Sequence, residues 1–145
     1  MATYTKYESF VEALLDGGAG SMDLFGTVDT IKAVIHTDAP VVATDNDLTD
    51  LTQITGTGYT AGGDDIQNDC TRSGGTATLT GVDVVWTAGA GDWTTTARYV
   101  SIHDDTATVP IADPLIASWD YGATFALGNG ETFTLDFGAS VFTLA

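Results

Sequence analysis

The chain has few basic residues. Four Lys and Arg residues stand against twenty Asp and Glu residues in 145 positions, which gives a formal net charge of −16. A nucleic-acid-binding surface needs clustered Lys and Arg to displace the counterions of the phosphates. We therefore expect binding neither to nucleic acid nor to an anionic membrane surface.

The chain also has one cysteine, Cys70, and no long hydrophobic run. A single cysteine excludes an internal disulfide. A bilayer span needs about 20 apolar residues, and a secretory leader needs a basic region followed by an apolar stretch; the sequence shows neither pattern. We expect a soluble protein that is made in the cytoplasm and stabilised by burial, strand pairing or assembly.

Apolar residues are nevertheless plentiful. They make up 43% of the chain and include three Trp, five Tyr and six Phe. This content and the length suit one compact domain. Gly, Thr and Asp are abundant and have weak helix propensity, so the composition favours a mainly β fold.

One helix is expected at the start of the chain. Thr5 and Glu8 have capping-box spacing, and a helical apolar stripe that includes Tyr7, Phe10 and Leu14 follows. The pattern predicts a helix over 4–15, ended by Gly17-Gly18. Residues 1–20 then form a helix with a Gly-rich hinge, which either reaches a neighbour as an arm or packs on one end of its own domain.

Short strands are expected over the rest of the chain. Alternating and β-branched segments predict strands at 30–36, 65–71, 76–80, 82–87 and 95–103, and a closing hairpin of 115–122 with 131–137 around Gly128-Asn129-Gly130. Strands at this spacing predict a single-domain antiparallel β-sandwich over 27–145, with a jelly roll among the allowed topologies. Asp47 is expected to cap a short helical turn, and glycines between 56 and 63 to adopt positive φ angles or to allow close backbone approach.

No metal or cofactor site is expected. Acidic residues cluster at three places, but none has the spacing of a calcium-binding loop. These clusters are Asp45, Asp47 and Asp50; Asp64, Asp65 and Asp69; and Asp104 and Asp105. The transition-metal ligand types, His36, His103 and Cys70, are isolated in sequence.

No catalytic residue and no small-molecule substrate are expected either. Asp120 and Asp136 form a conceivable carboxylate pair, but each alternates with apolar neighbours and is expected to face solvent. The serines, Ser101 and Ser118 among them, show neither a nucleophile-elbow motif nor a plausible paired His.

The aromatic residues leave a binding function open. Trp86, Trp93, Trp119 and Tyr121 would together suit a carbohydrate-binding module. However, Trp86 and Trp119 alternate with apolar residues and are expected in the core. Trp93 lies in a Gly-rich loop and is the one expected to be exposed.

The order of motifs along the chain resembles a family of head decoration, or cement, proteins from tailed bacteriophages. The motifs are Tyr7-Glu8-Ser9-Phe10, Leu14-Leu15-Asp16-Gly17, Asp29-Thr30-Ile31-Lys32-Ala33-Val34 with Ala39-Pro40, Leu48-Thr49-Asp50-Leu51-Thr52-Gln53-Ile54, Gly58-Tyr59-Thr60-Ala61-Gly62-Gly63, Val85-Trp86, Arg98-Tyr99, Trp119-Asp120-Tyr121-Gly122 and Gly130-Glu131-Thr132-Phe133. The resemblance covers most of the chain. It implies a non-enzymatic virion protein on the outer surface of the icosahedral head, often a homotrimer, that binds the major capsid protein and bridges its subunits.

The candidate interface residues come from the helix, an exposed aromatic residue and isolated bases. They are Tyr7, Phe10, Leu14, Lys32, Trp93 and Arg98. Lys32 and Arg98 have an alternative as local partners of Asp side chains. The alternative function is a tail or fibre module that binds host-surface carbohydrate.

Overall fold

The structure is a computed structural model that describes residues 3–25, 28–93 and 95–145. Within these ranges the chain is mainly β, with one short α-helix and one 3-10 turn, η1. The elements are β1 (Thr3–Lys6), α1 (Ser9–Leu15), β2 (Ile31–His36), η1 (Leu48–Asp50), β3 (Asp64–Asp65), β4 (Asp69–Ser73), β5 (Thr76–Thr80), β6 (Val84–Thr87), β7 (Ala97–Asp104), β8 (Leu115–Phe125), β9 (Thr132–Leu135) and β10 (Phe142–Leu144). Among the described residues, no helix has the length and hydrophobicity needed to cross a membrane.

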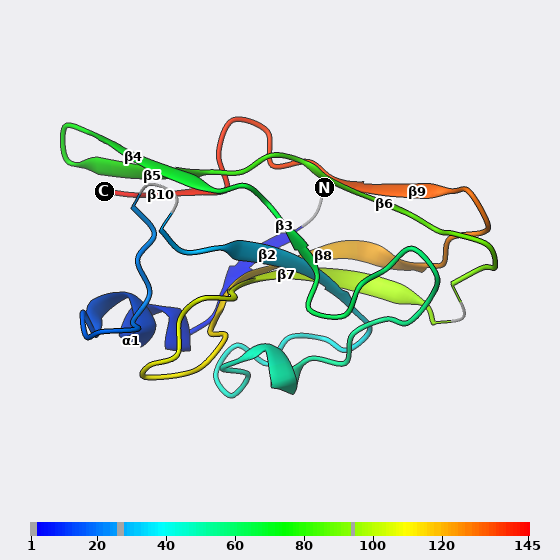
Figure 1. Cartoon of the computed structure of the whole chain (residues 1–145), viewed down its shortest axis with the longest axis horizontal. Helices are drawn as coiled ribbons and strands as arrows, with labels where there is room; N and C mark the ends of the chain where they lie inside the picture. Colours follow the sequence, from blue (N-terminus) through cyan, green and yellow to red (C-terminus); the bar gives the residue numbers. More distant parts are fainter. Residues whose placement is uncertain (1–2, 26–27, 94) are drawn as a thin grey trace.

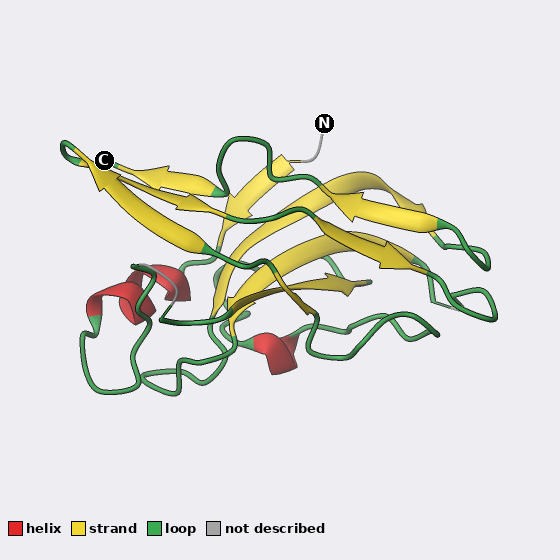
Figure 2. Cartoon of the chain, turned by 45° about the horizontal axis from the view of Figure 1, so that its top comes forward, coloured by secondary structure: helices red, strands yellow, loops and turns green. Residues whose placement is uncertain are grey.

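The strands form two layers, which confirms the predicted antiparallel β-sandwich (Figure 1). One layer is a five-stranded sheet in the order β1-β8-β7-β2-β3. The other consists of a three-stranded sheet, β10-β5-β4, and a two-stranded ribbon, β6-β9. Every one of these pairings is antiparallel. Figure 2 shows α1 at the end of the sandwich near β4 and β10, and η1 among the loops along one side.

Two inner strands of the five-stranded sheet, β2 and β7, are buried on both faces. β2 and β7 are almost fully buried because the second layer covers one face and the loops around η1 cover the other. The main core lies between the layers and includes Ile35, Ile102 and Trp86. A smaller cluster on the opposite face of the sheet includes Val34 and Leu115.

The N-terminal segment differs from the prediction. Residues 3–6 form β1, which pairs with β8 from Thr3 opposite Asp120 to Lys6 opposite Ala117, and α1 starts only at Ser9 without a side-chain cap. Edge pairing in the sheet outweighs the local capping pattern of Thr5. Phe10 of α1 packs into the core against Phe142, with ring centroids 5.6 Å apart. Residues 3–15 thus belong to the sandwich, so the arm hypothesis is wrong and packing on the chain's own domain is confirmed.

The closing strands are present but do not pair with each other. β8 pairs with β1 and β7, whereas β9 pairs with β6 in the other layer, so the predicted hairpin is wrong. The turn at Gly128-Asn129-Gly130 instead lies in a connection between the layers. The alternation within β9 is confirmed, because Leu135 is buried whereas Thr132 and Thr134 are exposed.

The glycine-rich loop at 56–63 needs its glycines, as predicted. Gly58 and Gly63 have φ angles of +91° and +78°. A Cβ atom on Gly63 would stand 2.1 Å from the carbonyl oxygen of Ala33, and one on Gly58 would stand 2.0 Å from that of Thr87. These contacts bring the loop onto β2 and beside β6.

The predicted turn at Asp47 also forms, because its carboxylate accepts the Thr49 N–H at 2.8 Å.

Candidate functional site

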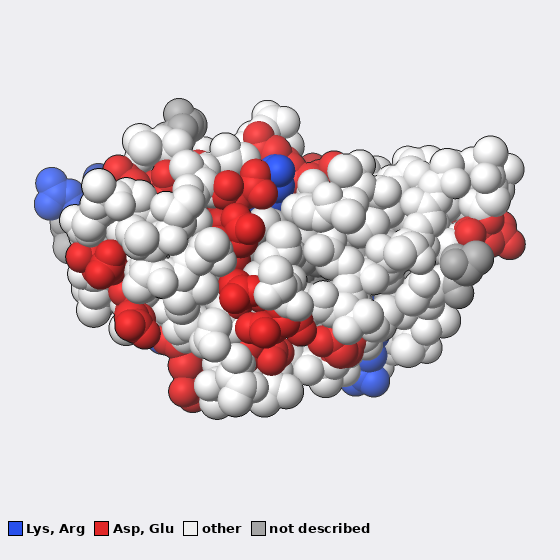
Figure 3. All heavy atoms as spheres, turned by 60° about the horizontal axis from the view of Figure 1, so that its bottom comes forward, with Lys and Arg blue, Asp and Glu red and all other residues white. Residues whose placement is uncertain are grey.

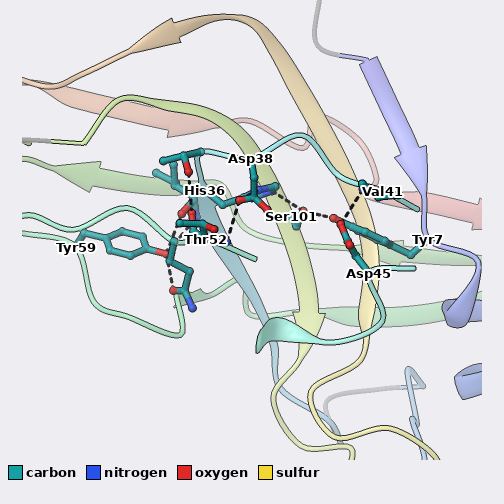
Figure 4. A network of polar contacts seen from close by, with 11 residues as sticks. Tyr7, His36, Asp38, Val41, Asp45, Thr52, Tyr59 and Ser101 are labelled. Atoms are coloured by element: carbon teal, nitrogen blue, oxygen red, sulfur yellow. Dashed lines mark hydrogen bonds and ion pairs between the residues drawn. The ribbon is translucent and has the colours of Figure 1, made fainter. Parts of the chain in front are cut away.

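A row of buried polar side chains crosses the outer face of the five-stranded sheet (Figure 4). The Tyr7 hydroxyl lies 2.9 Å from Oγ of Ser101, and the same Oγ lies 2.9 Å from Nε2 of His36. His36 ends β2, and Ser101 lies in the middle of the neighbouring strand β7. Tyr7 lies between β1 and α1, so the row connects the N-terminal segment to the centre of the sheet.

A carboxylate completes an Asp–His–Ser order of the kind found in hydrolases. Nδ1 of His36 lies 3.5 Å from Oδ1 of Asp38, which is too long for a strong hydrogen bond. Asp38 is partly exposed, whereas His36 is fully buried. The expectation that no serine has a paired His is wrong, because the fold brings Ser101 and His36 together from 65 positions apart.

Burial sets the protonation states in this row. Burial lowers the pKa of His36, opposed by the charge of Asp38, and burial raises the pKa of Tyr7 to about 12. Both groups are therefore neutral near pH 7. A neutral imidazole offers one donor and one acceptor nitrogen, which suits a hydrogen bond to a hydroxyl.

The surroundings of Ser101 favour a structural role for the row. Ser101 has 0% of its surface exposed, and it is paired on both sides, with Val34 of β2 and Ser118 of β8. The Tyr7 hydroxyl lies beside Oγ, where a reacting carbonyl would have to approach. A serine nucleophile must reach its substrate. The row instead supplies partners for polar atoms inside the sheet.

The sequence did contain a signal for this row. β7 is an apolar run interrupted by Ser101 and His103, two positions apart and thus on one face of the strand. A buried polar side chain needs a hydrogen-bond partner. The sequence does not predict which residue is the hydrogen-bond partner, because the register between neighbouring strands decides it.

An aromatic groove opens between β8 and β9. It has a volume of about 280 Å³ and is lined by Trp119, Tyr121, Phe133 and Asp136, among other residues. Tyr121 is 54% exposed, and its ring centroid lies 5.7 Å from that of Phe133 in an edge-on arrangement. Trp86 is buried as predicted, while Trp119 is only partly buried. Aromatic surface and a carboxylate therefore lie side by side in this groove.

The proposed carboxylate pair is not arranged for acid–base work. Arg98 donates from Nε to Oδ1 and from a terminal nitrogen to Oδ2 of Asp120, both at 2.8 Å. The hydrogen bonds from Arg98 hold the pKa of Asp120 at about 2, so this carboxyl stays ionised. Asp136 is exposed at the groove, and its Oδ1 accepts the Gly138 N–H. Arg98 is therefore the local partner of an Asp side chain, which was the predicted alternative to an interface role.

A second groove, the apolar groove, lies between α1 and the three-stranded sheet. It has a volume of about 260 Å³, and its lining includes Leu14, Leu24, Phe25, Phe142 and Leu144. Phe25 is 51% exposed and Leu144 41%. Acidic side chains form a band across the face of the molecule that Figure 3 shows. The molecule thus combines an acidic exterior with a local apolar surface.

The predicted interface residues divide between core and surface. Tyr7, Phe10 and Trp93 are at most 2% exposed, so these three candidates lie in the core of the chain, and the expectation that Trp93 is exposed is wrong. Trp93 is buried because its ring packs on Gly56 and its Nε1–H donates to the Thr57 carbonyl at 3.3 Å. Leu14 lines the apolar groove.

Local contacts explain most of the acidic clusters. Asp45 and Asp50 accept the N–H groups of Val41 and Asn46, both at 2.7 Å, so these carboxylates cap turns. Asp104 is buried, and burial followed by its neighbour Asp29 raises its pKa to about 7.

Comparison with family models, curated proteins and solved structures found no match.

Proposed function

We propose that this chain is a capsid decoration protein of a tailed bacteriophage, which binds the outer surface of the head and bridges major capsid subunits. The observation that carries the proposal is the apolar groove on an otherwise acidic body. Phe25 and Leu144 leave apolar surface in water at its rim. Apolar patches bordered by polar residues mark protein contacts. The motif order along the chain supports the same role.

The charge of the chain defines the chemistry of the partner. With a net charge of −16, the chain is attracted to a capsid surface that presents an apolar side chain surrounded by neutral or basic residues. Long-range attraction of this kind weakens as salt rises. The resemblance adds a homotrimer to the same proposal, and β3 and β4, which end their sheets, offer strand edges for contacts with another chain.

Co-sedimentation with heads that lack a decoration protein tests the proposal. Phe25→Ser should weaken binding about tenfold, because burial of the exposed half of a phenyl ring contributes about 1–2 kcal/mol. Val85→Ser is the matched control, because Val85 is 55% exposed on β6, outside the apolar groove. Equal binding by both variants, or absence of binding by the wild type, would refute the proposal.

The aromatic groove favours a second candidate, a tail or fibre module that binds carbohydrate. Tyr121 and Phe133 offer apolar surface to a sugar ring, and the Asp136 carboxylate can accept hydroxyl hydrogen bonds. A glycan array distinguishes the candidates. Retention that Tyr121→Ala abolishes and Phe25→Ser leaves intact would support the carbohydrate module over the decoration protein.

A further inference from the structure

Three side chains of metal-ligand type meet at the end of β7. A ring nitrogen of His103 and one carboxylate oxygen each from Asp105 and Asp113 all lie within 4.8 Å of one another. His103 belongs to β7, Asp105 follows the strand directly, and Asp113 lies just before β8. The loop between the two strands therefore returns to its starting point and closes the cluster.

His103 has one ring nitrogen free for a ligand. The side chain is fully buried, and its Nε2 lies 3.1 Å from the Gly62 carbonyl oxygen, to which it donates its hydrogen. Nδ1 then carries a lone pair and has no hydrogen-bond partner among the described residues. A buried unpaired nitrogen is costly. Metal-binding histidines show this same arrangement, with the second nitrogen donating to a backbone carbonyl.

The backbone holds the three residues in place. His103 is paired with Lys32 of β2 and with Leu115 of β8. The Asp105 N–H donates to the Thr30 carbonyl at 2.9 Å, and the Asp113 N–H donates to the Ala107 carbonyl at 3.1 Å. Little ordering of the main chain remains for a ligand to impose.

We propose that His103, Asp105 and Asp113 bind a divalent transition-metal ion, with Zn²⁺ favoured over Ca²⁺. Imidazole nitrogen with carboxylate oxygens suits Zn²⁺, whereas Ca²⁺ takes six to eight oxygen ligands. Bonds of about 2.0–2.2 Å to Zn²⁺ place ligand atoms about 3–4 Å apart, so small rotations of the two carboxylates complete the site. Three protein ligands leave one position for water or for a side chain of another chain.

Lys32 competes for this site. Its Nζ lies 2.6 Å from Oδ2 of Asp105, where it supplies positive charge to the cluster. This salt bridge confirms the local-pair interpretation of Lys32. A metal ion bound to Asp105 would have to share or displace the ammonium group. Removal of that group should therefore strengthen metal binding.

Calorimetric titration of the chelator-treated full chain with Zn²⁺ tests the site. Asp113→Asn should weaken binding at least about tenfold, because even the loss of a group that only supports a metal ligand costs about 10–100-fold in affinity. Asn suits the position because Asp113 has a φ of +48° and Asn tolerates this region. Lys32→Gln should tighten binding severalfold. The matched controls, Asp16→Asn and Lys6→Gln, change exposed charges outside the cluster and should bind as the wild type does.

Thermal unfolding gives a readout that does not depend on heat of binding. Zn²⁺ should raise the melting temperature of the wild type and of Asp16→Asn more than that of Asp113→Asn, because only binding to the folded state stabilises it. Equal Zn²⁺ affinity of Asp113→Asn and the wild type would overturn the proposal. Absence of both heat and stabilisation in the wild type at millimolar Zn²⁺ would overturn it as well.

Discussion

Ser101→Ala should destabilise the protein far more than its small change in volume indicates. Ser101 Oγ is the shared partner of the Tyr7 hydroxyl and of His36 Nε2, each at 2.9 Å. Removal of Oγ leaves two buried polar atoms without this partner. An unsatisfied buried group costs about 1–3 kcal/mol, so the loss of both hydrogen bonds should lower the free energy of unfolding by about 2–6 kcal/mol.

Tyr7→Phe should cost less in the wild type. It removes one hydrogen bond, worth about 1 kcal/mol, and Ser101 keeps its bond to His36. In the Ser101→Ala background the same substitution removes an unpaired buried hydroxyl instead. There, Tyr7→Phe should stabilise the protein by about 1 kcal/mol. The effect of one substitution therefore changes sign with its background.

Urea unfolding followed by tryptophan fluorescence measures the four members of this cycle, with equal m-values as the check that the unfolded states are comparable. Ser73→Ala in the exposed part of β4 is the control and should stay within about 0.5 kcal/mol of the wild type. The coupling between Tyr7 and Ser101 is refuted if Tyr7→Phe destabilises both backgrounds equally.

Three further predictions concern pH, a glycine and the helix. Burial lowers the pKa of His36, so the unfolded chain binds a proton at this residue before the folded chain does, and the free energy of unfolding falls as the pH drops below about 6.5. Urea titrations at pH 5 and pH 8 should show a smaller fall for His36→Gln than for the wild type. Equal falls in the two proteins would contradict this prediction. Gly63→Ala should destabilise the protein by more than about 3 kcal/mol, because the new Cβ atom would overlap the backbone of Ala33. Gly62→Ala places its Cβ atom in open space and should cost about 1 kcal/mol of backbone strain. Similar melting temperatures of the two variants would exclude the overlap at Gly63. Phe10→Ala should cost about 3–5 kcal/mol in urea unfolding, and a loss below 1 kcal/mol would mean that α1 does not pack on the core.

Local patterns in the sequence predicted where several elements begin and end, because residue alternation and capping are properties of neighbouring residues. The predicted strand at 76–80 matches β5, and 30–36 and 95–103 match β2 and β7 to within two residues. Asp47 caps its turn because the accepting carboxylate and the donating N–H are two residues apart. Such interactions depend on a few neighbouring residues, and these are what a sequence pattern records.

Pairings between distant segments were not predictable from such patterns. The capping-box spacing of Thr5 predicted a helix, yet the free edge of β8 takes residues 3–6 as a strand. Trp93 looked exposed in its Gly-rich loop, but the loop at 56–63 folds over it. In both places a contact with a remote part of the chain outweighs the local preference.

The sequence by itself determined the acidic character, the absence of an internal disulfide and the β-sandwich class, because composition and period-two alternation act wherever the chain goes. Only the tertiary structure decided which side chains meet. Strand register placed Ser101 beside His36, and the return of the loop before β8 placed Asp113 beside His103. These contacts join residues 10 and 65 positions apart, and a shift of one residue in strand register would turn Ser101 to the opposite face of the sheet.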